Sequence, residues 1–153
     1  MPVHTPQTVQ RDGSSDPDDP CGPYEALLYS DSGGLTQFGA FVEILPPGSA
    51  SSLLHWHAKE DEMILVLEGT VDLHEGKDVT ALRPGDAATF KAGVPVGHRL
   101  VNSSNSVARY IVIGTRAPRD TVTYPRHNRV LHLDRTTEER RYTTVSGLPA
   151  DKP

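Results

Sequence analysis

The sequence predicts an all-β chain with a single domain, and three observations lead to this fold class. Thirteen glycines and thirteen prolines interrupt the 153 residues too often for long helices. Short apolar runs recur along the chain, each bounded by turn residues, as in a sandwich or barrel of short strands. The length allows one core of ordinary size, and no second block of apolar periodicity is present.

The apolar runs give the expected strands in chain order. They cover residues 26–29, 37–45, 52–57, 62–68, 71–74, 79–82, 87–90, 98–101 and 109–115. Pairs such as Pro47-Gly48 and Pro84-Gly85 lie between runs and favour turns. We therefore expect no helix that competes with this pattern.

The run 62–68 is apolar on both faces of the strand that it predicts. Ile64 and Val66 point to one face, and Met63, Leu65 and Leu67 to the other, because side chains alternate along a strand. A strand that is apolar on both faces is usually covered on both. One cover is the core, and we expect the other to be the N-terminal segment or a second subunit in a homodimer.

Composition divides the chain into three segments. Residues 1–23 contain five prolines and four aspartates and cannot bury enough apolar surface to order themselves, so they predict an arm that is flexible or packs on a partner. Residues 24–116 hold the expected strands and form the predicted barrel. Residues 117–153 are rich in arginine, and we expect them to form an extension that packs on the barrel.

Charge and cysteine content exclude several classes of partner. The net charge of -5 provides no basic face for nucleic acid or an anionic membrane, so a small molecule is the expected partner. Cys21 is the single cysteine and cannot form an intramolecular disulfide. No apolar run is long enough to span a bilayer, and the polar N-terminus does not resemble a signal peptide, so we expect a cytoplasmic protein.

A cluster of potential metal ligands lies at residues 55–62. On a strand, His55 and His57 project from the same face, because residues two apart share a face. Glu62 begins the next strand after a short polar link, so its carboxylate can return to that side. Two neutral imidazoles with one carboxylate suit a divalent ion such as Fe, Mn, Ni or Zn.

A second segment, residues 85–102, contains a fourth candidate metal ligand. A turn, a short strand and a glycine-containing bend lead to His98 at the start of another strand. Alone, this residue would be an ordinary strand histidine. Together with the first segment it becomes a candidate ligand of the same ion.

These two segments resemble the two motifs of the cupin family, G-x5-H-x-H-x3-4-E-x6-G and G-x5-P-x-G-x2-H-x3-N. Residue by residue, the resemblance carries the family's metal ligands to His55, His57, Glu62 and His98. The framework positions fall on Gly69, Gly85, Gly93 and Asn102. The resemblance implies a double-stranded β-helix, or jelly-roll barrel, with the metal deep in its mouth.

The sequence departs from the motifs at a few positions. Lys91 stands where the second motif has proline, and four residues rather than two separate Gly93 from His98. Glu60 and Asp61 are rival acidic ligands. We prefer Glu62, because it begins the apolar strand and keeps the six-residue spacing to the motif glycine.

The resemblance implies a metalloenzyme with one divalent ion that acts on a small oxygen-rich metabolite, similar to bacterial cupins described as sugar-phosphate-isomerase-like. A non-haem iron dioxygenase would use the same ligands and stays open, as does a metal or small-molecule binding protein without catalysis. The catalytic residue is unknown, with Glu60 and His74 as candidate bases. Lys91 is either a substrate-binding residue for an anionic group or a solvated lysine at a strand end.

Overall fold

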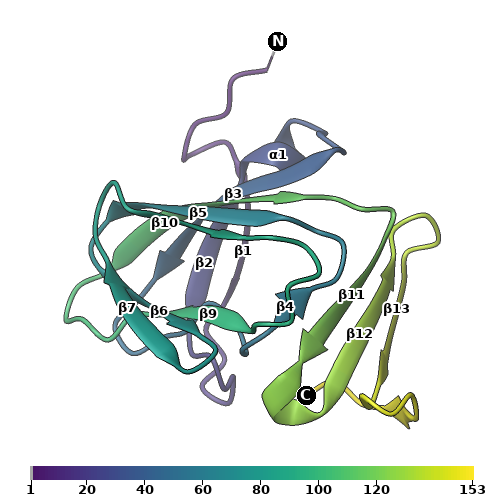
Figure 1. Ribbon diagram of the computed structural model, residues 1–153. Coiled ribbons are helices and arrows are strands. Elements are labelled where there is room, and N and C mark those ends of the chain that lie inside the picture. The colour runs from purple at the N-terminus through teal and green to yellow at the C-terminus, as the bar shows by residue number, and fades with distance from the viewer. Residues whose placement is uncertain (1) are drawn as a thin grey trace.

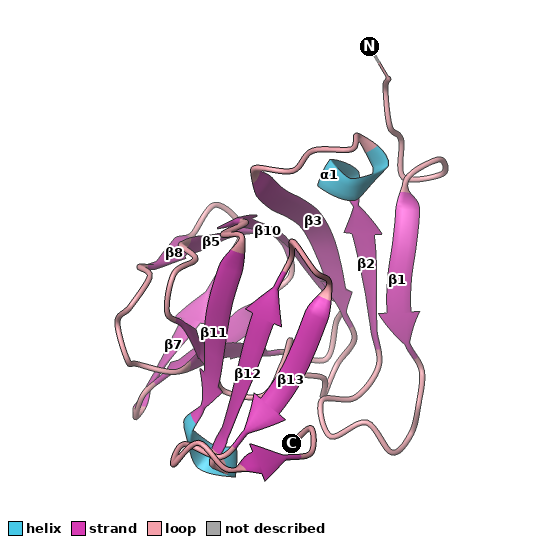
Figure 2. Ribbon diagram, turned by 90° about the vertical axis from the view of Figure 1, so that its right-hand side faces the viewer, coloured by secondary structure: helices cyan, strands magenta, loops and turns pink. Residues whose placement is uncertain are grey.

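The computed structural model describes residues 2–153, and strands make up almost all of its regular structure (Figure 1, Figure 2). The strands are β1 (Gln10–Ser14), β2 (Tyr24–Leu28), β3 (Phe38–Leu45), β4 (Trp56–His57), β5 (Glu62–Glu68), β6 (Val71–Glu75), β7 (Asp78–Leu82), β8 (Ala87–Phe90), β9 (His98–Val101), β10 (Ala108–Thr115), β11 (Arg119–Tyr124), β12 (Arg129–Asp134), β13 (Glu139–Thr143) and β14 (Pro149–Ala150). The helices are the single turns α1 (Tyr29–Ser32) and η1 (Pro125–His127). No helix among the described residues is long and apolar enough to cross a membrane.

The strands form three antiparallel sheets. Their orders are β1-β2-β3-β10-β5-β8, β7-β6-β9 and β14-β13-β12-β11-β4. In Figure 1 the first two sheets face each other, and the third stands at one side of them. This is the jelly-roll arrangement that the sequence predicted, with the C-terminal strands added as a separate sheet.

The core lies between the six-stranded and three-stranded sheets. Its buried residues are Leu45, Ile64, Val66, Val71, Leu73, Leu82, Leu100, Ala108, Tyr110 and Val112. Ile64 and Val66 of β5 share one face as expected, and this face points inward; full burial of side chains of this size stabilises the fold by roughly 1.5–3 kcal/mol each. On the outer face of β5, Met63 and Leu65 are half-buried and Leu67 is exposed.

Two residues that match motif framework positions have structural roles. Gly69 joins β5 to β6 with a φ of 75°, and a Cβ atom there would lie 2.6 Å from the Val107 carbonyl oxygen. Asn102 is fully buried, and its side-chain amide donates hydrogen bonds to the carbonyl oxygens of Leu45 (2.7 Å) and Ser106 (2.8 Å). Both residues therefore serve the barrel itself.

The predicted strands 62–68, 87–90 and 98–101 have the observed bounds, whereas the two ends of the chain differ from expectation. The segment 1–23, for which we expected an arm that is flexible or packs on a partner, contains strand β1, which pairs with β2, and a buried Val9. Backbone hydrogen bonds to a sheet edge supply the order that its composition does not. Strands β11 to β14 were not predicted, because arginine and threonine interrupt their apolar alternation.

Candidate metal centre

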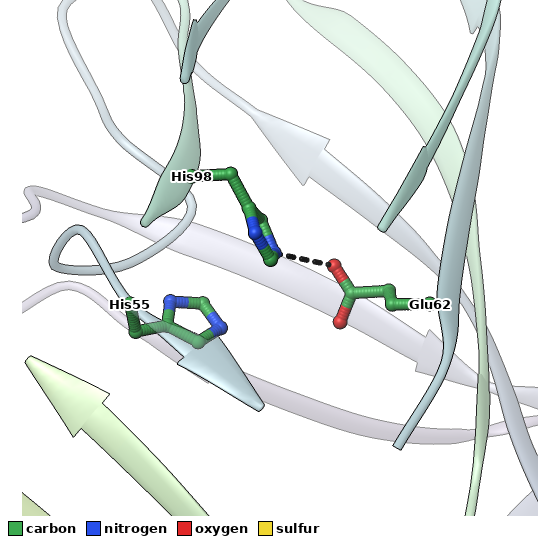
Figure 3. A group of neighbouring side chains, drawn as sticks. All are labelled: His55, Glu62 and His98. Carbon is green, nitrogen blue, oxygen red and sulfur yellow. Dashed lines mark ion pairs between the residues drawn. The ribbon is translucent and has the colours of Figure 1, made fainter. Parts of the chain in front are cut away.

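Three chain segments bring His55, Glu62 and His98 together. His55 comes just before β4 and forms an antiparallel bridge with His98 at the start of β9; the His98 N–H donates to the His55 carbonyl oxygen at 2.8 Å. The two imidazole centroids are 4.9 Å apart. Glu62 is the first residue of β5, and its carboxylate points toward His98 (Figure 3).

These three residues, which we call the barrel group, can offer one ligand atom each within 4.8 Å of one another. His98 Nε2 lies 3.3 Å from Glu62 Oε1, but this nitrogen is buried and completes no hydrogen bond with a described residue. The His98 ring is held by stacking on Phe90, with centroids 3.6 Å apart. A buried nitrogen without a partner beside a carboxylate is the arrangement expected where a cation binds.

The protonation states of the barrel group also suit a metal ion. His55 Nδ1 lies 2.9 Å from the Leu53 carbonyl oxygen, which can only accept, so Nδ1 carries the hydrogen and Nε2 keeps its lone pair. Burial, reinforced by His98, lowers the pKa of His55 to about 4. Burial alone would raise the pKa of Glu62, but His98 and His55 outweigh it and lower this pKa. Neutral imidazoles and an ionised carboxylate are the forms that bind metals.

The fourth predicted ligand, His57, lies beside the barrel group but has a second set of contacts. Its ring centroid is 5.1 Å from that of His55. Its Nδ1 donates to Asp120 Oδ2 at 2.7 Å, which leaves Nε2 as its remaining donor atom. Burial would lower the pKa of His57, whereas the Asp120 hydrogen bond and the Glu62 charge outweigh it and raise this pKa.

His57, Glu60 and Asp120, which we call the C-terminal group, also offer ligand atoms within 4.8 Å of one another. Apart from His57 Nε2, however, their ligand atoms are engaged by protein groups. Glu60 Oε1 accepts from Arg135 Nη1 at 2.6 Å and from the Ala117 N–H at 2.9 Å. Arg135 and the Ala117 N–H therefore occupy the carboxylate of Glu60, the first of the two rival acids.

The other rival acid, Asp61, is exposed and also engaged. Its Oδ1 accepts from the Ala92 N–H at 2.8 Å, and its own N–H donates to Thr115 Oγ1 at 3.0 Å. Of the three neighbouring acids, Glu62 alone belongs to the barrel group. This position agrees with the preference for Glu62 among them.

Two cavities of about 180 Å³ each adjoin Glu62 and His98. The outer cavity is also lined by His57 and by Lys91, which lies exposed at its rim. The inner cavity extends into the barrel between the sheets. His74, the other candidate base, lies on β6 opposite Arg99 and lines neither cavity.

The inner cavity contains two polar residues that the sequence analysis missed. Glu43 of β3 is 6% exposed and lies opposite Tyr110 of β10, which is fully buried. The Tyr110 hydroxyl is directed at Glu43 and Ser51 but completes a hydrogen bond with no described residue. Burial, opposed by Tyr110 and reinforced by Glu62, raises the pKa of Glu43 to about 8.

One signal could have identified Glu43. In the run 37–45 it shares the inward face with Phe41 and Leu45, so it is a charged residue at a core position of an apolar strand. Asp120 carried no comparable signal, because it lies in a polar, arginine-rich segment whose strands were not predicted.

Comparisons with known proteins match the chain to one family and to solved structures with a similar fold. The family model described as cupin domain matches residues 41–114. A solved structure from Silicibacter pomeroyi, described as a sugar phosphate isomerase from a cupin superfamily, is 33% identical, with a TM-score of 0.89 over 98% of this chain and 97% of that chain. No curated protein sequence matches the chain.

Two further solved structures share the fold at lower identity. One from Acidithiobacillus ferrooxidans, provisionally described as a sugar phosphate isomerase, is 23% identical, with a TM-score of 0.84 over 99% of this chain and 97% of that chain. One from Thermotoga maritima, described as a predicted oxalate decarboxylase, is 21% identical, with a TM-score of 0.62 over 75% of this chain and 99% of that chain.

Proposed function

The chain belongs to the cupin superfamily, and from this premise we propose that it is a metal-dependent isomerase of a small sugar or sugar phosphate. The observation that carries the proposal is the barrel group, with its buried and unpartnered His98 Nε2 between two cavities. The relative from Silicibacter pomeroyi, at 33% identity over nearly the full length of both chains, supports the reaction class.

In this proposal one divalent ion, Fe, Mn, Ni or Zn, is held by His55, His57, Glu62 and His98. The barrel group supplies three donors, and His57 supplies the nitrogen that its hydrogen bond to Asp120 leaves free. When bound, the ion would act as a Lewis acid that polarises a carbonyl group of the substrate. The mixed nitrogen and oxygen donors fit any of these four metals.

An aldose–ketose isomerisation moves one proton from the carbon next to the carbonyl to the carbonyl carbon and one proton between the two oxygens, so it needs a base beside these two carbons. Glu43 is the residue that we assign to this role, because it lines the inner cavity together with the barrel group and forms no ion pair with a described residue. Its pKa of about 8 makes its carboxylate a stronger base than that of an exposed glutamate. Glu60 fits the role less well, since Arg135 holds its carboxylate.

Lys91 is a candidate for recognition of a phosphate group, since it lies at the rim of the outer cavity. In Lys91→Ala we expect the KM of a phosphorylated substrate to rise while the metal content stays unchanged. The matched control is Lys77→Ala in the turn between β6 and β7, which lines neither cavity. Equal KM values in the two variants would remove Lys91 from the site.

The function is tested by metal analysis followed by turnover. Protein purified without added metal is expected to contain about one divalent ion per chain. Metal-loaded protein is then incubated without O2 in D2O with a panel of aldoses, ketoses and their phosphates, and the products are followed by NMR. Isomerisation with solvent deuterium in the product supports the proposal. Conversion that requires O2 would indicate a non-haem iron dioxygenase, and tight binding without conversion a binding protein.

A second copy of the chain is the partner that we propose for the outer face of the six-stranded sheet. Met63 and Leu65 of β5 and Ile111 and Ile113 of β10 are half-buried apolar side chains on its central strands. Light scattering after gel filtration is expected to give the mass of a homodimer. Leu65→Lys is expected to give the monomer mass, and a monomeric wild type would refute the proposal.

A further inference from the structure

We propose that the C-terminal sheet completes the metal centre, with Asp120 as the residue that positions His57 for binding. This inference rests on the proposed metal site, although its structural part can be tested without metal. It extends the centre from the four predicted ligands to a residue in a segment that carries no cupin motif.

The Asp120 carboxylate is fixed on both oxygens. It is 4% exposed, its Oδ2 accepts from His57 Nδ1 at 2.7 Å, and its Oδ1 accepts from the Lys59 N–H at 2.8 Å. The same residue therefore holds the His57 ring and the backbone two residues further along the chain. Little freedom remains for the ring to turn.

The backbone around His57 belongs to the C-terminal sheet as well. Strand β4 pairs with β11, with His57 opposite Val122, and the Ala58 N–H donates to the Thr121 carbonyl oxygen at 2.9 Å. The barrel contacts this segment through the bridge between His55 and His98 and through the Gly93 N–H, which donates to the His57 carbonyl oxygen at 2.9 Å. The strand that carries His57 is thus the edge strand of the sheet that supplies Asp120.

The chemical consequence concerns which nitrogen of His57 is free. A carboxylate only accepts, so its bond to Nδ1 requires the hydrogen on Nδ1 and leaves the lone pair of the neutral ring on Nε2. Without Asp120, the ring could exchange tautomers and rotate. Removal of a residue that hydrogen-bonds to a metal ligand without binding the metal itself typically lowers metal affinity about 10–100-fold.

A second contact from the C-terminal sheet keeps Glu60 away from His57. Glu60 Oε2 lies 3.8 Å from His57 Nδ1, close enough to compete with Asp120 for this nitrogen. Arg135, which directly follows β12, holds Glu60 through both carboxylate oxygens, at 2.6 Å and 3.3 Å. The guanidinium also supplies positive charge beside the C-terminal group, so a second metal ion is not needed there.

The test measures the affinity of the full-length protein for Zn²⁺ by competition with a coloured chelator. In Asp120→Ala we expect the affinity to fall about 10–100-fold. In Asp120→Asn we expect a smaller fall, because the amide oxygen can still accept from Nδ1. The control is Asp134→Asn, since Asp134 is a hydrogen-bonded carboxylate of the same sheet that binds Arg119 and not the centre.

A second measurement uses the metal-free protein. Nitrogen-15 NMR of the His57 ring is expected to show the Nδ1–H tautomer in the wild type and a mixture in Asp120→Ala. Unchanged affinity and an unchanged tautomer in a folded Asp120→Ala variant would overturn the inference. If that variant does not fold, Asp120→Asn decides, and a Zn²⁺ affinity equal to that of the wild type overturns the inference.

Failure of the proposed function gives a different result. A wild type that binds neither Zn²⁺ nor another divalent ion would refute the metal site. The His57 tautomer in metal-free wild type and Asp120→Ala would then still decide whether Asp120 positions the ring.

Discussion

The barrel group and the C-terminal group both offer three ligand atoms within 4.8 Å, and His55 and His57 place them next to each other. In the barrel group, His98 Nε2 is buried without a hydrogen bond and the pKa of His55 is low. In the C-terminal group, Asp120 holds His57 and Arg135 holds Glu60. The barrel group has ligand atoms available, whereas hydrogen bonds and an ion pair occupy those of the C-terminal group apart from His57 Nε2.

The difference shows how a potential metal site can be separated from a polar framework. The proximity of histidines and acids is the same in both groups. What differs is whether protein groups already satisfy the donor atoms, because a buried polar atom without a partner is destabilising unless a ligand pairs with it. The barrel group is therefore the candidate metal site, and the C-terminal group holds His57 beside it.

The largest expected effect follows from removal of a donor of the barrel group. His98→Ala should lose most of the bound metal. This loss is larger than the fall in metal affinity of roughly 10–100-fold that we expect for Asp120→Ala. Elemental analysis after dialysis against a weak chelator measures it. His74→Ala is the control, because this histidine lines neither cavity. Full metal retention in His98→Ala would contradict the comparison.

The second prediction concerns Glu43, the unpaired acid next to the barrel group. The pKa of Glu43 is about 8 in the folded protein and 4.5 ordinarily, so the folded protein favours the protonated carboxyl group. This contribution to the free energy of unfolding is complete below pH 4.5 and is lost as the pH rises through 8. Between pH 6.5 and 8 the metal-free wild type should lose about 2 kcal/mol relative to Glu43→Gln. Urea unfolding at the two pH values measures this difference.

His55 limits the pH range of that experiment. The pKa of His55 is lowered from 6.5 to about 4, so the folded protein favours the neutral ring. This contribution to the free energy of unfolding is lost as the pH falls below 6.5, where the contribution of Glu43 rises instead. Above pH 6.5 the effect of Glu43 is separate from that of His55. Equal pH dependence of the wild type and Glu43→Gln in this range would mean that the carboxyl group is solvated rather than buried.

The smallest expected effect concerns the ion pair between Arg135 and Glu60 in the C-terminal group. Arg135→Met leaves Glu60 without its ion pair and should reduce the free energy of unfolding by about 1–2 kcal/mol. Arg141→Met is the matched control, because its partner Glu139 is exposed and such pairs contribute about 0–1 kcal/mol. Equal losses in the two variants, measured by urea unfolding, would show that Glu60 is not held by its partner.

The parts that the sequence predicted are those encoded by neighbouring residues. Strand β5 was predicted with its bounds, and its inward residues Ile64 and Val66 are buried, because alternation follows from strand geometry alone. His55, Glu62 and His98 were found from spacing and the two motifs. Strands β1 and β11 were missed, because their order comes from pairing with an existing sheet rather than from their own composition.

The sequence by itself thus determined the fold class, the barrel strands and the residues that we propose as metal ligands. The tertiary structure alone decided which donors of these residues are free. Asp120 reaches His57 across 63 positions and Arg135 reaches Glu60 across 75. A strand period is a local property of the backbone, whereas the pairing of a buried charge depends on which distant segment the fold brings beside it.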